Sequence, residues 1–166
     1  MKNGIWCILF LLFVGFAFPQ EEQTAPSFTF AGKGNDTITN TKLQGRLVYI
    51  YFWASWNPAS RKHHPALVKL YEKYRMKAQT GGKRFDVAGI SLDEQDYNRL
   101  LAMKQDDLHW PYHACDFKGW EGSYVLAFGV KRIPASFLIN EQGKIIARDL
   151  FGKALEQTVD SLLVSN

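Results

Sequence analysis

A run of apolar and aromatic residues at 47–53, LVYIYFW, limits the folds open to this chain, because such a run suits a strand that is buried on both faces. A helix signal follows it. Asn57 is a favoured helix N-cap, and Pro58 fits the first helical position. Apolar residues then recur at spacings of three and four, at Leu67, Leu70, Tyr71 and Tyr74. The pattern predicts a central strand and a helix over residues 58–77.

The rest of the chain alternates in the same way. A second buried strand is expected at 85–91 and a second helix at 94–104, with Asp93 as its cap. The remaining elements are short strands at 28–30 and 36–38, an extended segment at 110–115, a short helix at 124–128, a hairpin of strands 135–139 and 144–149, and a helix at 154–164. Strand–helix–strand units favour parallel pairing with right-handed crossovers, and the hairpin adds antiparallel strands. The predicted fold class is α/β, with a mixed central sheet flanked by helices.

The first residues are typical of an export signal. Lys2 is followed by an apolar run at residues 5–18, which is too short to span a bilayer comfortably and fits a signal-peptide core. Small residues at Gly15 and Ala17 favour cleavage after Ala17. We therefore predict a signal peptide at 1–17, a flexible lead-in at 18–25 and one domain at 26–166, in a periplasmic or secreted protein. The alternative is an uncleaved anchor, which would be the chain's membrane contact.

Cleavage would also remove one of the two cysteines. Cys7 lies within the signal, so the mature chain would keep Cys115 alone and could form no internal disulfide. The domain must then be stable through its core. The net charge is +4, and the chain has no long basic run or basic–aromatic alternation, so we expect no nucleic-acid partner.

Residues 53–65, WASWNPASRKHHP, carry the most specific signal in the chain. They resemble the TlpA/ResA-type branch of the thioredoxin superfamily, which reads W-A-x-W-C-x-P-C here. Further likeness lies at 87–93, at 129–139 and at 143–146, so the resemblance covers roughly residues 26–164. It implies a thioredoxin-like fold and a family of thiol–disulfide oxidoreductases.

The departures from that pattern fall on the chemical positions. Asn57 stands where the family has its attacking cysteine, Ser60 stands at the resolving cysteine, and His63 stands at an acid that tunes those thiols. Disulfide exchange requires a thiolate that attacks a disulfide sulfur. Neither an amide nor a hydroxyl supplies one. We therefore expect no catalytic residue at these positions, no cofactor, and a non-redox binding or chaperone-like module.

The resemblance also indicates where such a module would bind. In the family the bond equivalent to Ile133–Pro134 is cis, and its loop faces the helix N-terminus and offers backbone groups to an extended peptide. The predicted binding residues are Trp56, Asn57, Pro58, Ile133 and Pro134. The partner would be an extended peptide or an envelope protein. An alternative is that Pro134 serves the fold alone.

Cys115 supports a rival interpretation, a thiol–disulfide or peroxide oxidoreductase of cell redox homeostasis that acts through this thiol or through thiols of a partner. Cys115 follows His113 by two residues, so both fit one face of an extended strand, and a thiol near an imidazole can be reactive. A small buried core residue is the more common role for a lone cysteine. A third interpretation is a structural domain in an envelope complex.

The histidines do not suggest a metal site. His63 and His64 are adjacent on the predicted helix and point in different directions, and Pro111 prevents a helical pair of His109 with His113. A metal ion needs three or four convergent ligands. We therefore expect no metal and four surface histidines.

Overall fold

The computed structural model describes residues 23–31, 36–42, 45–78 and 83–164. The predicted signal peptide at 1–17 lies outside the described residues. The elements, in chain order, are β1 (Thr29–Ala31), β2 (Thr37–Thr39), β3 (Arg46–Trp53), α1 (Pro58–Ala78), β4 (Arg84–Ser91), α2 (Asp96–Gln105), β5 (Tyr112–Ala114), a 3-10 turn (Gly119–Glu121), α3 (Ser123–Ala127), β6 (Ala135–Ile139), β7 (Ile145–Arg148) and α4 (Gly152–Val164).

The central sheet is mixed, as the sequence predicted. Its strand order is β5-β4-β3-β6-β7, and β1 pairs with β2 in a separate hairpin. The pairs β3–β4 and β4–β5 are parallel, whereas β3–β6 and β6–β7 are antiparallel. The apolar run therefore occupies the middle strand of the sheet, which confirms its predicted central place.

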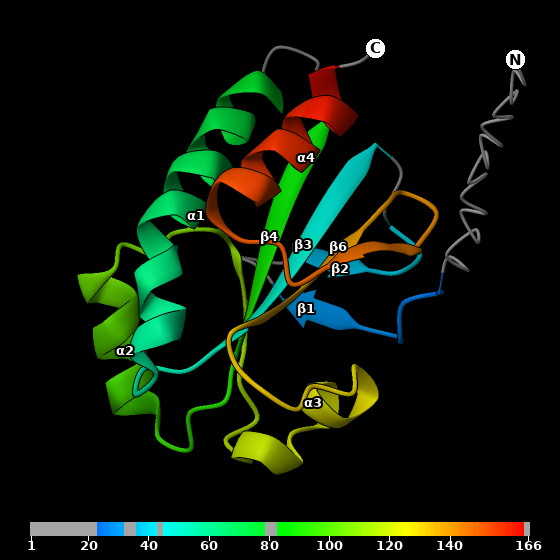
Figure 1. The fold of residues 1–166 in the computed structure, drawn as a ribbon. Helices are drawn as coiled ribbons and strands as arrows, with labels where there is room; N and C mark the ends of the chain where they lie inside the picture. Colours follow the sequence, from blue (N-terminus) through cyan, green and yellow to red (C-terminus); the bar gives the residue numbers. More distant parts are fainter. Residues whose placement is uncertain (1–22, 32–35, 43–44, 79–82, 165–166) are drawn as a thin grey trace, which may run out of the picture.

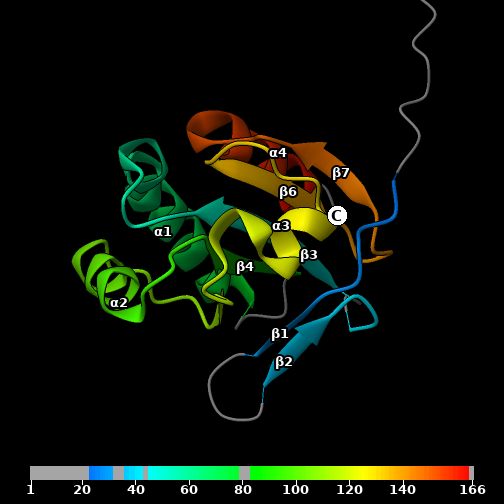
Figure 2. The same ribbon diagram turned by 90° about the horizontal axis from the view of Figure 1, so that it is seen from below.

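The two faces of the sheet carry separate cores, because successive side chains of a strand point to opposite faces. Val48, Ile50 and Phe52 pack with residues of β1, β2 and α3. Tyr49, Tyr51 and Trp53 pack with residues of α1, α2 and α4. Figures 1 and 2 show the same division, with the β1–β2 hairpin and α3 on one side of the sheet and the three longer helices on the other.

The N-terminal boundary of the domain differs from the prediction. The backbone of Ala25 donates to the oxygen of Gly143 at 2.9 Å, and Ile145 donates to the oxygen of Gln23 at 2.8 Å. Thr24 also bridges Lys144 in antiparallel fashion, and Ala25 is buried. Residues 23–25 are thus paired with the β6–β7 hairpin and belong to the fold, so assigning them to a flexible lead-in was wrong.

The sheet topology brings two connections to one edge. Phe52 near the end of β3 pairs with Ala135 at the start of antiparallel β6. The loop that leaves β3 and enters α1 therefore lies beside the loop that enters β6. These two loops carry the residues that the sequence marked as a binding site.

Candidate functional site

Asn57 caps the N-terminus of α1. Its side-chain Oδ1 accepts from the backbone N–H of Ser60 at 2.8 Å, and its own carbonyl accepts from Arg61 N–H at 3.2 Å. A cap of this kind satisfies one of the unpaired N–H groups in a first helical turn, and replacing it by alanine typically costs about 0.5–2 kcal/mol. The predicted N-cap is confirmed.

The same side chain contacts the loop before β6. The Ile133–Pro134 peptide bond is cis, as the family resemblance implied. The Asn57 Nδ2 group donates to the carbonyl oxygen of Ile133 at 3.4 Å. One amide therefore serves α1 with its oxygen and the cis-proline loop with its nitrogen. The structure thus brings together both halves of the predicted site, with Ile133 and Pro134 half-buried and Pro58 exposed.

Ser60 faces inward. Its side chain is fully buried, and Oγ has no hydrogen-bond partner among the described residues. Both of its backbone groups form hydrogen bonds. The N–H donates to the Asn57 side chain, and the carbonyl accepts from the Tyr51 hydroxyl at 2.6 Å. A hydroxyl in this position is shielded from large substrates, so Ser60 is not a surface nucleophile.

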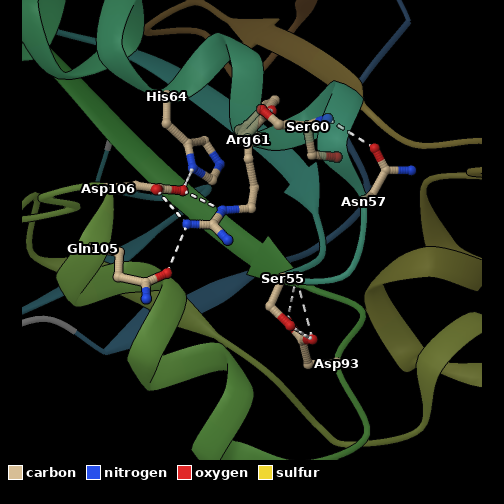
Figure 3. A network of polar contacts seen from close by, with 9 residues as sticks. Ser55, Asn57, Ser60, Arg61, His64, Asp93, Gln105 and Asp106 are labelled. Atoms are coloured by element: carbon tan, nitrogen blue, oxygen red, sulfur yellow. Dashed lines mark hydrogen bonds and ion pairs between the residues drawn. The ribbon is translucent and has the colours of Figure 1, made fainter.

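A polar network behind Ser60 was not predicted (Figure 3). His64 is fully buried, and its Nδ1 lies 2.7 Å from Asp106 Oδ2, just after α2. Arg61 also binds this carboxylate, through Nε at 2.8 Å and Nη2 at 2.6 Å, and its Nη2 reaches Gln105 at 3.0 Å. The network joins the first turns of α1 to the end of α2.

The expectation of a surface histidine was therefore wrong for His64. The sequence held a signal for its burial, because His64 continues the stripe of Leu67, Tyr71 and Tyr74 back by one helical step. Burial lowers the pKa of His64, although Asp106 works against this shift. The Arg61 hydrogen bond in turn lowers the pKa of Asp106 despite its partial burial.

Asp93 holds the loop between β3 and α1 (Figure 3). This buried carboxylate accepts from the backbone N–H of Ser55 at 3.0 Å and from the Ser55 hydroxyl at 2.5 Å. Ser91 donates a further hydrogen bond at 2.5 Å. The predicted role of Asp93 as the cap of the second helix was wrong, since α2 begins at Asp96 and its N-cap is Gln95.

His63, at the family's tuning-acid position, has no carboxylate to offer. Its ring stacks on Phe151 with centroids 4.6 Å apart. Burial, with the nearby charge of Lys62, lowers its pKa and favours the neutral imidazole. The position therefore contributes a packing contact to the segment before α4.

Cys115 is the free cysteine of the described residues. It is half-buried, and its Sγ donates to the carbonyl oxygen of Asp93 at 3.2 Å. Burial raises the pKa of its thiol, which favours the less reactive protonated form. The nearby His113 ring stacks on Trp110. Across the described ranges no three His, Cys, Asp or Glu side chains gather as metal ligands.

Trp56 is the exposed apolar residue of the site, with 55% of its surface accessible. It borders two open hollows. One, of about 260 Å³, lies against α2 and is also lined by Arg61, Leu101 and Ala102. The other, of about 370 Å³, is lined by Asp93, Glu94, Gln95 and Asn98. The indole therefore offers an apolar contact beside the Asn57 cap.

Comparisons with known proteins agree with this architecture. A family model described as Redoxin matches residues 20–162. A thiol-disulfide oxidoreductase ResA from Bacillus thuringiensis is 30% identical over 159 residues, covering 93% of this chain and 85% of the relative. A thiol:disulfide interchange protein DsbE from Pseudomonas fluorescens is 28% identical over 126 residues, covering 76% and 62%. The structure of a thiol-disulfide oxidoreductase from Bacteroides fragilis matches with a TM-score of 0.72 at 29% identity, over 85% of this chain and all of that one (100%).

Within the described part of the chain, no helix combines the length and apolar character that crossing a bilayer requires.

We predict that the free energy of unfolding of His64→Phe will fall less steeply on acidification than that of the wild-type protein. The lowered pKa of His64 means that the unfolded chain takes up a proton before the folded one, so wild-type stability falls as the pH drops below about 6.5. Phenylalanine fills the buried site and cannot be protonated, while Asp106 keeps Arg61. Urea unfolding at several values between pH 7.5 and 5.5 measures the slope.

His109 supplies a control of opposite sign. Burial opposes protonation there, but bonds to the Asp107 carbonyl and Glu72 prevail and raise the pKa of His109. This histidine stabilises the fold below about pH 6.5, and the contribution is lost as the pH rises through its raised pKa. His109→Gln should therefore steepen the loss on acidification. An unchanged slope in His64→Phe would contradict the assigned role of His64.

We also predict that the triple variant Asn57→Cys, Ser60→Cys, Cys115→Ser will form an intramolecular disulfide. The Asn57 side chain already points back over the first turn to Ser60, and two residues separate the positions. The helix N-terminus and Lys62 should lower the pKa of the first thiol. Thiol titration across glutathione buffers is the measurement. If the thiols stay free under oxidising conditions, the geometry of the dithiol site has not been kept.

Proposed function

The chain belongs to the redoxin family. Within this family, we propose that it is a non-redox member, a chaperone-like module that binds extended peptides at the Asn57–Pro134 site. Its fold is thioredoxin-like, and Asn57 and Ser60 replace the two active-site cysteines. The observation that carries the proposal is the Asn57 side chain, which caps α1 and contacts the cis-proline loop. An amide keeps these elements together without any thiol.

The chemistry of the residues supports a non-redox role. A thiol–disulfide cycle needs a nucleophilic thiolate and a second thiol that resolves the mixed disulfide. Asn57 has no ionisable nucleophile, and Ser60 is buried. Cys115 is half-buried, donates its hydrogen to a backbone carbonyl and has a raised pKa. The rival oxidoreductase interpretation would have to use this thiol or those of a partner.

The surface of the site supports peptide binding. Exposed aromatic residues are frequent anchors in protein interfaces, and Trp56 lies directly before the Asn57 cap. Backbone groups in a loop can pair with an extended peptide whatever its sequence, while neighbouring side chains give selectivity. We further propose that residues 1–17 direct export, which would place the module in the periplasm or outside the cell, where an envelope protein could be its partner.

The first test is the reduction of insulin by dithiothreitol. We expect no acceleration above the buffer rate, because the two active-site positions carry no thiols that could cycle. The triple variant Asn57→Cys, Ser60→Cys, Cys115→Ser provides the positive comparison on the same scaffold. Turnover by the wild-type protein that disappears in Cys115→Ser would overturn the non-redox role and support the rival.

The second test measures binding directly. S-carboxymethylated α-lactalbumin is permanently unfolded and offers extended segments without free thiols. We predict that Trp56→Ala will weaken its binding about tenfold, or ~1.4 kcal/mol, as expected for an aromatic anchor. Fluorescence anisotropy of the labelled polypeptide gives the affinities.

Met76→Ala is the matched control. Met76 is 57% exposed, close to the 55% of Trp56, and lies near the C-terminal end of α1, away from the site. Its loss should leave binding unchanged. Equal effects of the two substitutions would show that binding does not use the Asn57–Pro134 site.

A further inference from the structure

Lys131 and Arg132 lie in the loop just before the cis-proline bond, and Lys62 lies in the second turn of α1; we refer to these three cationic residues as the basic rim. All three are exposed. Arg132 pairs with Asp149 at 2.8 Å and still has 77% of its side chain accessible. Within the described residues, Lys62 and Lys131 form no ion pair, so their charges are available to a ligand.

Contacts between the elements bring together the segments that carry the rim. The Asn57 amide reaches Ile133, which follows Lys131 and Arg132 in the chain. His63, next to Lys62, stacks on Phe151. The Arg132–Asp149 pair joins the loop before β6 to that same segment before α4. The N-terminus of α1 adds a partial positive charge at this edge.

The opposite side of the site has a different character. There Trp56 and Leu101 border the hollow against α2, and Leu101 is 41% exposed. Glu94 lies beyond Trp56, in the second hollow. The site is therefore cationic beside the cis-proline loop. Beside α2 it offers the apolar surfaces of Trp56 and Leu101, the charge of Arg61 is paired with Asp106, and Glu94 lies at the margin. An extended ligand that crosses Asn57 meets both sides.

We infer that the ligand is an extended peptide with an acidic residue facing the basic rim and a large apolar side chain in the Trp56–Leu101 hollow. This inference rests on the proposed peptide-binding function. Charge complementarity selects an anionic segment, since Lys62 and Lys131 lack ion-pair partners in the described part of the chain and Glu94 disfavours anions on the other side. Exposed ion pairs are weak and screened by salt, so the preference is modest and depends on ionic strength.

The test uses three labelled unstructured peptides that share one phenylalanine and differ at two adjacent positions, which are Glu, Gln or Lys. We expect the Glu peptide to bind about threefold to tenfold more tightly than the Gln peptide at low salt, and the Lys peptide to bind most weakly. The difference should shrink as salt is raised. Fluorescence anisotropy reports all three affinities.

The variant Lys62→Glu, Lys131→Glu should abolish or invert this order. The variant Lys42→Glu, Lys69→Glu is the matched control, with the same change of net charge at exposed lysines away from the rim, and it should keep the order. A neutral variant, Lys62→Gln, Lys131→Gln, should make the Glu and Gln peptides bind alike. It tests the role of the rim even if the charge-reversed variant does not fold.

The outcomes separate the two proposals. If all three peptides bind the wild-type protein equally, and Trp56→Ala weakens them, the peptide-binding function stands and the acidic preference is overturned. If the order persists in the rim variants, the rim is not its source and the inference fails. If no peptide binds the wild-type protein, the proposed function itself fails and the inference fails with it.

Discussion

Burial of β3 on both faces governs the whole arrangement. Val48, Ile50 and Phe52 need apolar cover on one side, and Tyr49, Tyr51 and Trp53 need it on the other. Each covering layer must connect back to the sheet, and the chain that leaves β3 does so by entering α1. The N-terminus of α1 is thereby fixed at the sheet edge where β6 begins. The position of the site follows from the packing of this one strand.

The site itself shows how polar side chains connect the elements of a thioredoxin-like scaffold at positions that carry no thiols. A helix N-terminus requires hydrogen-bond acceptors, and the Asn57 side chain supplies one while also reaching Ile133. The serine behind it is sealed in the core. Beneath the first turns, the carboxylate of Asp106 accepts hydrogen bonds from Arg61 and lies against His64. Polar contacts thus connect the N-terminal turns of α1 to the cis-proline loop and to the end of α2.

Local patterns predicted the helices and strands and the start of α1, and the family resemblance predicted the cis-proline loop. Asn57 before Pro58 marks a helix start through its own chemistry, and Ile133–Pro134 was placed by its resemblance to a known strand. Most of the interactions that sequence reasoning missed join distant residues. His64 and Asp106 are 42 positions apart, and Ser55 and Asp93 are 38 apart. Pairing of Thr24 with Lys144 likewise depends on how the sheet closes. No short window of sequence contains both partners of such a contact.

The attachment of α2 has a consequence for motion. Ala102 is its one buried residue in ten, so little apolar burial holds this helix to the sheet. Met103 is partly buried against the same core, and the Asp106 contacts to Arg61 and His64 fasten the end of the helix. A segment fastened in this way can open as a separate unit at a free energy below that of global unfolding. Its backbone amides would then exchange with solvent earlier than those of β3 and β4. Each opening would also move Leu101 away from Trp56 and widen the hollow between them. The side of the site beside α2 would therefore change shape while the contact between Asn57 and the cis-proline loop remained.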